Sequence, residues 1–86
     1  MSEIVQNVSG VIMVSCEGSA CMEVVKRANS QIKGVTDAFR VLKTKSSGDI
    51  NVIINMDAVS KKQILDAKDD VLKLDGVKSI KYRIAD

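Results

Sequence analysis

The sequence predicts an α+β fold in which two helices cover one face of a four-stranded antiparallel sheet. Strand-like and helix-like spacings of apolar residues follow one another along the chain in the order β-α-β-β-α-β. A helix, a Gly-Val pair and a strand occur in succession twice, around Gly34-Val35 and Gly76-Val77. The 86 residues contain no proline and no linker, which indicates a single domain. We expect residues 1–9 to form a tail or the start of the first strand, and residues 10–86 to form the domain.

The first half of the predicted domain is a strand followed by a helix. The run from Val8 to Cys16 is apolar on both faces, which is typical of an inner strand. A turn follows at residues 17–19, where Ser19 is a suitable N-cap. The next apolar residues have the spacing of one helical stripe, formed by Cys21, Val24, Val25, Ala28 and Ile32. Gly34 is expected to end this helix as the residue after the C-cap.

The middle of the chain is predicted to be a hairpin of two strands. The second strand runs from residue 35 to about residue 45, and the third covers residues 50–57. The turn between them is expected at residues 46–49, where glycine and aspartate suit the backbone dihedrals. Ile53 falls on the sheet face away from the helices. The face toward the helices is expected to carry Ile50, Val52, Ile54 and Met56.

The second half of the domain ends with a helix and a strand. Ser60 and Gln63 have the spacing of a capping box. The helix after them is expected to bury Ile64, Leu65, Ala67, Val71 and Leu72. Gly76 is expected to end it, and residues 77–84 form the last strand. This order is that of the ferredoxin-like plait, whose second sheet face must be solvated or covered by a ligand or a partner.

The composition argues against several classes of function. Histidine is absent, which removes the commonest general base and every Ser-His or Cys-His pair. The turn at 17–19 has one glycine and no lysine suitably placed to hold phosphate. We therefore expect a protein that is not an enzyme and uses no cofactor. The net charge of +2 is too small to argue for nucleic acid or an anionic membrane.

The expected location is the cytoplasm. No apolar run approaches the length of a membrane span. The first residues lack the basic and apolar regions of a secretion signal. Two cysteines in such a chain are expected to be free thiols.

Cys16 and Cys21 are the candidate thiols for a metal or redox site. Their Cys-x4-Cys spacing differs from the Cys-x2-Cys of such sites, and two ligands do not complete a structural metal site. Cys21 also fits the apolar stripe of the first helix. We therefore favour two buried thiols and predict no metal ligands.

Basic residues in the strands raise the alternative of RNA binding. Sheets of this fold bind RNA by stacking bases on aromatic side chains, and only Phe39 and Tyr82 are available. A solvated basic face is therefore favoured. The basic residues concerned are Arg40, Lys43, Lys45, Lys78, Lys81 and Arg83.

Residues 10–84 resemble the C-terminal effector domain of the Lrp/AsnC family, an ACT-like domain also called RAM. The family's domain has a strand leading to a Gly-Ser turn, two Gly-Val pairs and a Thr-Gly-Asp-Tyr-Asp-like segment. The similar segments here are residues 11–19, Gly34-Val35, residues 47–51 and Gly76-Val77. The sequence departs from the family at Ile50 and Asn51, which stand where the tyrosine and the second aspartate are usual.

The resemblance implies a non-enzymatic, homo-oligomeric domain that senses a small molecule or regulates transcription. Family members pair their sheets face to face, so a homodimer forming a dimeric α/β barrel is expected, with larger oligomers also open. Its dimer face would include Ala38, Leu42 and Ile53. The effector, an amino acid or other small molecule, would lie against Gly48, Asp49 and Asn51.

The resemblance also implies what the chain does not contact, and it leaves alternatives open. Residues 1–9 cannot supply the family's DNA-reading helix, so no direct DNA binding and no membrane contact are expected. The same plait fits a peptide-binding maturation chaperone of the NapD type, which binds a signal peptide on its sheet. A third alternative is a structural module whose partner is another chain. Metal chaperones of this fold are disfavoured because their Cys-x2-Cys loop is absent.

Overall fold

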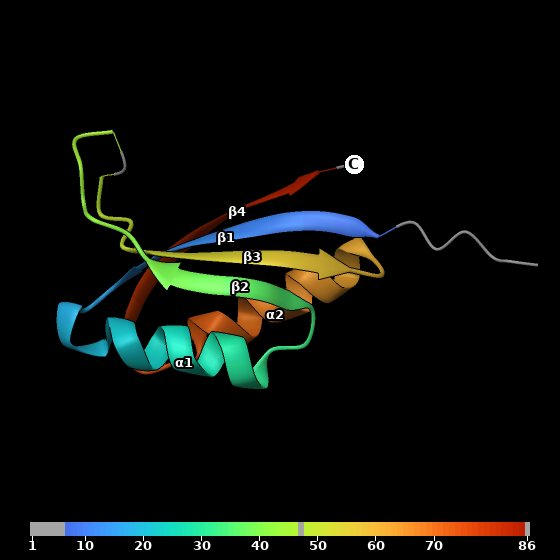
Figure 1. Ribbon diagram of the computed structural model, residues 1–86, viewed down its shortest axis with the longest axis horizontal. Helices are drawn as coiled ribbons and strands as arrows, with labels where there is room; N and C mark the ends of the chain where they lie inside the picture. The colour runs from blue at the N-terminus through green and yellow to red at the C-terminus, as the bar shows by residue number, and fades with distance from the viewer. Residues whose placement is uncertain (1–6, 47, 86) are drawn as a thin grey trace, which may run out of the picture.

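The computed structural model describes residues 7–46 and 48–85, and its elements follow the predicted order (Figure 1). They are β1 (Val8–Cys16), a 3-10 turn (Gly18–Ala20), α1 (Cys21–Gln31), β2 (Val35–Arg40), β3 (Val52–Ala58), α2 (Lys61–Leu72) and β4 (Val77–Ala85). The strand order is β2-β3-β1-β4, and every neighbouring pair is antiparallel. This is the predicted ferredoxin-like α+β plait. Residues 1–6 of the expected tail lie outside the described residues.

Both helices lie on the same side of the sheet, and the core fills the space between these two layers (Figure 1). Alternate residues of the central strands β1 and β3 point into this core because successive strand side chains face opposite ways. The predicted apolar stripes of the two helices pack against these strand residues. Leu72, which was predicted to be buried with the second stripe, is 45% exposed. The largest fully buried side chains of the two layers include Ile12, Val14, Val24, Val52, Ile54, Ile64 and Val71.

The two repeated glycines have a different role from the one predicted. Gly34 and Gly76 lie two and three residues beyond the helix C-caps, so neither directly follows a cap. Each stands third in a β-turn closed by a backbone hydrogen bond, at φ +93° and +86°. A positive φ at this place is typical of a type II turn, which favours glycine. The repeat is therefore a repeated turn into a strand, formed by residues 32–35 and 74–77.

The two helices begin differently. Helix α2 begins as predicted, because the Gln63 N–H donates to Ser60 Oγ over 3.3 Å. The Gln63 side chain accepts from the N–H of Val59, one residue before the cap. Ser19 does not cap α1: it lies inside the 3-10 turn, and the cap residue Ala20 has no side-chain hydrogen bond.

The connection between β2 and β3 is longer than predicted. Strand β2 ends at Arg40 and β3 begins at Val52, so the connection, described at residues 41–46 and 48–51, is a wide loop rather than a tight hairpin. Two hydrogen bonds hold the base of this loop, from Val41 N–H to Asn51 O and from Asn51 N–H to Val14 O. Figure 1 shows the loop rising on the side of the sheet away from the helices. Ser47 of the predicted turn lies outside the described residues.

Candidate functional site

The sheet face away from the helices is the first candidate site. Antiparallel pairing places cross-strand partners on the same face, so the register identifies which side chains lie side by side. One row across the four strands consists of Phe39, Ile53, Met13 and Lys81. The next row consists of Asp37, Asn55, Val11 and Arg83. Three of the four residues on the inner strands, Val11, Met13 and Ile53, are apolar and the fourth is Asn55, whereas the charged residues of these rows stand on the two outer strands.

Neither α1 nor α2 covers these two rows, and we call their eight residues the open face (Figure 1). Val11, Met13 and Ile53 are half-buried, and Phe39 is 38% exposed. Contiguous apolar surface that no other element covers is a common feature of binding sites, so this face is a candidate binding surface. The prediction that Ile53 points away from the helices is correct.

Ala38 does not belong to this open face, so its prediction as a dimer contact is wrong. It is 4% exposed and pairs with Ile54, which points into the core. The reason is an irregularity in β2, where Val35 and Asp37 pair with the consecutive residues Met56 and Asn55. The extra residue reverses the alternation of side chains, as a β-bulge does.

Phe39 takes the place predicted for Ala38. Sequence reasoning missed it because the bulge has no glycine or other signal that would announce it. Leu42 lies two residues beyond the end of β2 and is 89% exposed. It therefore does not share the sheet face with Ile53, and its contact with a partner stays a prediction.

A hollow of about 290 Å³ lies where the 41–51 loop bends over the open side of the sheet. Gly48 and Asp49 line it, as does Ile50, which was predicted to face the helices from within a strand. The wall on the side of the sheet is formed by Met13, Ser15, Ser79, Ile80 and Lys81. The structure thus brings two predicted effector residues together with a lysine that sequence reasoning did not connect to them.

Asn51, the third predicted effector residue, does not line this hollow. It is 5% exposed, and its amide is occupied by backbone groups. The Cys16 N–H donates to Asn51 Oδ1 over 3.0 Å, and Asn51 Nδ2 donates to the Cys16 carbonyl over 2.8 Å. A buried amide with these bonds holds β1 against the start of β3. The structure assigns Asn51 to the support of the sheet, and the prediction that it lines a ligand site is corrected.

Cys16 and Cys21 are free thiols buried side by side, with 3.1 Å between their sulfur atoms. Burial raises the pKa of the Cys16 thiol to about 12, and its hydrogen bond with Cys21 acts in the same direction. A thiol with so high a pKa is a poor nucleophile at neutral pH. The favoured interpretation of two buried thiols is therefore consistent with their environment.

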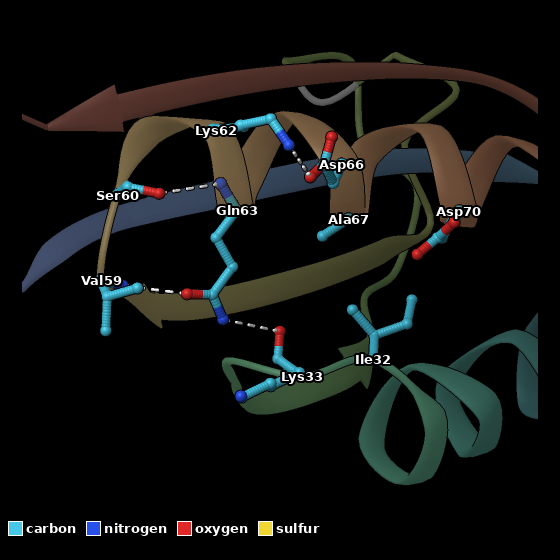
Figure 2. A pocket seen from close by; sticks show the side chains of 9 residues that line it. All are labelled: Ile32, Lys33, Val59, Ser60, Lys62, Gln63, Asp66, Ala67 and Asp70. Carbon is cyan, nitrogen blue, oxygen red and sulfur yellow. Dashed lines mark hydrogen bonds and ion pairs between the residues drawn. The ribbon is translucent and has the colours of Figure 1, made fainter.

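A second depression lies on the helical side of the molecule, between the start of α2 and the turn after α1 (Figure 2). Gln63 crosses it, with its Nε2 donating to the Lys33 carbonyl over 3.3 Å. Asp66 on its wall is paired with Lys62. These contacts join the two helix-turn repeats across the depression.

The described residues contain no group of three or more histidine, cysteine, aspartate or glutamate side chains suited to hold a metal ion. In the same part of the chain, no helix has the length and apolar character needed to cross a membrane.

The fold is shared with several solved structures. TTHA0845 from Thermus thermophilus superposes with a TM-score of 0.77 at 11% identity, over 91% of each chain. FFRP-DM1 gives 0.74 at 16% identity, over 91% of this chain and 97% of that one. AsnC from E. coli gives 0.72 at 14% identity, and the 91% of this chain that matches spans 50% of AsnC. At such identities the similarity shows the fold alone, which this chain shares with FFRP-DM1 and AsnC.

Other proteins share the same plait. The Tat proofreading chaperone NapD of E. coli has a TM-score of 0.68 at 14% identity, over 92% of this chain and 78% of NapD. The ACT domain of GTP pyrophosphokinase from Chlorobium tepidum has a TM-score of 0.62 at 14% identity, over 91% of this chain and all of that one. No family model matches the sequence, and no curated protein matches it.

Proposed function

We propose that this protein is a self-associating regulatory module of the Lrp/AsnC effector type, which pairs through the open face of its sheet. The observation that carries this proposal is the group of apolar side chains on that uncovered face, formed by Val11, Met13, Phe39 and Ile53. A chain this small buries only about 60–65% of the surface of its unfolded form, so burying this group adds to a limited core. The similarity to FFRP-DM1 and AsnC supports the proposal.

Sedimentation velocity over a wide range of concentrations tests self-association. We expect a dimer or larger species in the native protein and a shift toward monomer in Ile53→Asp, because a carboxylate would be desolvated in the interface. Met22→Asp is the matched control, since Met22 is 62% exposed on α1 in the opposite layer. A native protein that stays monomeric at every concentration overturns the proposal.

The hollow beneath the 41–51 loop is the proposed effector site. Asp49 and Lys81 both line it, so its walls carry opposite charges that suit the ammonium and carboxylate groups of a free amino acid. Isothermal titration against the individual amino acids tests this idea. We expect at least one to release or absorb heat, and Asp49→Asn to weaken that binding about tenfold or more. No heat with any amino acid removes the effector claim and leaves self-association untouched.

The alternative is a peptide-binding chaperone, and the similarity to NapD favours it. Strand β4 is a nine-residue edge strand, so its outer backbone groups are open to strand addition. The two functions differ in a simple measurement. A chaperone of this type is a monomer that binds a twin-arginine signal peptide, whereas the proposed regulatory module is an oligomer that does not.

A further inference from the structure

Cys16 and Cys21 place their thiols side by side where β1 leads into α1. The two residues are 1% and 0% exposed, and their sulfur atoms lie 3.1 Å apart. A disulfide bond is about 2.0 Å long, so the two sulfur atoms need to approach by only about 1 Å to form one. The reduced protein therefore already has the two sulfur atoms near bonding distance.

The backbone on each side of the pair fixes the two thiols in this arrangement. Cys16 is the last residue of β1, and the Asn51 amide binds both its N–H and its carbonyl. Cys21 is the first residue of α1. Groups that are already held together lose little freedom when they react, which favours bond formation between them. The fold thus favours a bond within the chain over a bond to another molecule.

The turn between the two cysteines is the route by which a reagent reaches them. Glu17, Gly18 and Ser19 are exposed, and Cys21 Sγ donates to the Glu17 carbonyl over 3.5 Å. A Cβ at Gly18 would meet nothing within 4 Å among the described residues, so no other described element packs over this point. Exposed turns open locally at a lower free-energy cost than the whole fold. Opening of this turn uncovers Cys21 first.

We infer that Cys16 and Cys21 form a reversible redox site, which a small soluble disulfide such as oxidised glutathione converts into a disulfide bond within the chain. The inference concerns the thiol pair alone. It is independent of the proposed self-association and of the proposed effector site, because the two sulfur atoms lie in the core between the sheet and the helices.

The oxidation takes place in two exchange steps. The Cys21 thiolate attacks one sulfur of oxidised glutathione, which breaks that disulfide and releases one glutathione thiolate. The Cys16 thiolate then attacks the Cys21 sulfur of the mixed disulfide, and the second glutathione thiolate leaves. The two released thiolates take up the two protons that the cysteines lose. Two electrons thus pass from the cysteine pair to glutathione, and the reverse steps restore both thiols.

The closed turn keeps the reduced pair unreactive. Burial raises the pKa of Cys16 to about 12 in this state, so its thiol stays protonated at neutral pH. A glutathione group attached to Cys21 does not fit a site that is fully buried, so the turn stays open until the second step. Water then reaches Cys16, and the burial that raised its pKa is removed. Oxidation therefore depends on opening of the turn.

Equilibration with glutathione tests the inference. The protein is incubated in mixtures of oxidised and reduced glutathione, quenched with acid and analysed by intact mass. We expect a product that has lost two hydrogen atoms and carries no glutathione, in a yield that does not depend on protein concentration. We expect its equilibrium constant against glutathione to be about tenfold or more higher in the native protein than in the protein unfolded in urea, because the fold holds the sulfur atoms together.

The variants Cys16→Ala and Cys21→Ala test the order of the two steps. Neither forms the bond within the chain, and circular dichroism verifies that each is folded. We expect Cys16→Ala to gain glutathione at Cys21, the thiol beside the turn. Cys21→Ala should react about tenfold more slowly or less, because its remaining thiol lies at the end of β1 and donates to Asn51 Oδ1. Equal rates in the two variants would overturn the assignment of the first attack to Cys21.

Three outcomes overturn the redox site itself. The first is a native protein that keeps both thiols reduced at every ratio of oxidised to reduced glutathione. The second is a native protein that ends as a glutathione adduct without a bond between its cysteines. The third is an equilibrium constant no higher in the native protein than in the unfolded chain. Sedimentation and amino-acid titration carried out in a reducing buffer are unaffected by each of these results, so the proposed function is tested separately.

Discussion

Asn51 shows how one side chain can support the sheet beside a candidate ligand site. Its amide accepts from the Cys16 N–H and donates to the Cys16 carbonyl, both in the buried part of the molecule. These two backbone groups lie at the end of β1, where the register with β4 shifts between Ser15 and Cys16. The Asn51 side chain thus satisfies buried backbone groups at an irregular point of the sheet.

Asn51→Ala tests this role. The substitution leaves the Cys16 N–H and carbonyl without their partner, so we expect the free energy of unfolding to fall by about 2–4 kcal/mol. Urea denaturation at fixed protein concentration measures it. Asn29→Ala is the matched control: it removes a single bond to the Ala38 carbonyl from an exposed asparagine and should cost no more than about 1.5 kcal/mol. Equal losses in the two variants would contradict a special role for Asn51.

The raised pKa of Cys16 predicts a dependence of stability on pH. The folded thiol keeps its proton up to about pH 12, whereas the unfolded thiol begins to lose it near pH 9. Between these values the unfolded state binds fewer protons, so stability falls as pH rises, by at most about 1.4 kcal/mol per pH unit. Other groups titrate in this range, so the measurement is the difference between the native protein and Cys16→Ala. We expect this difference to shrink from pH 9 to pH 11, and a constant difference would refute the prediction.

At the scale of the elements, the two halves of the chain use the same turn. Gly34 and Gly76 each stand at positive φ before a strand, and each approaches a group from another element. A Cβ at Gly34 would meet Gln63 Nε2 at 2.6 Å, and one at Gly76 would meet the Ala20 side chain. The repeated Gly-Val pair therefore reflects both backbone conformation and the close packing of a turn.

Gly76→Ala is expected to destabilise the fold by about 2 kcal/mol or more, since left-handed backbone strain of about 1–2 kcal/mol adds to the contact with Ala20. Gly18→Ala is the control, because a Cβ there meets nothing within 4 Å and its φ is not positive. Thermal denaturation of the two variants measures the difference. A Gly76→Ala protein as stable as Gly18→Ala would show that the turn tolerates a side chain.

At the scale of the whole molecule, the described residues form two layers, a sheet and a pair of helices, with one interface between them. The core between the sheet and the helices contains the fully buried residues, whereas the open face keeps Phe39 and Ile53 partly exposed. If the face is covered by self-association, folding stability includes a contribution from the partner. Stability then depends on protein concentration, because only the folded chain associates.

We therefore expect the urea midpoint of the native protein to rise when its concentration is raised a hundredfold. The midpoint of Ile53→Asp should stay constant over the same range, because this variant is expected to remain monomeric. Fluorescence is weak in a chain with one tyrosine and no tryptophan, so circular dichroism is the suitable signal. A native midpoint that does not move with concentration would contradict association in this range.

The order of elements, the layer of helices and most of the core could be predicted from the sequence. They depend on the spacing of apolar residues, which is local and repeats over several turns or strand residues. The apolar stripe from Cys21 to Ala28, the cap at Ser60 and the outward direction of Ile53 are of this kind. The repeated Gly-Val pair could also be found in the sequence, but its place in a turn before each strand could not be predicted.

Tertiary structure decided which residues make up the candidate site. The irregularity near Asp37 exchanges the faces of β2, which removes Ala38 from the open face and places Phe39 on it. The 41–51 loop carries Asp49 toward Lys81 and buries Asn51. One extra residue in a strand, or a different course of a loop, changes the direction in which a side chain points. Both features depend on contacts between residues that are distant in the sequence. The sequence by itself therefore determined the plait, and the fold in space determined what its open face presents.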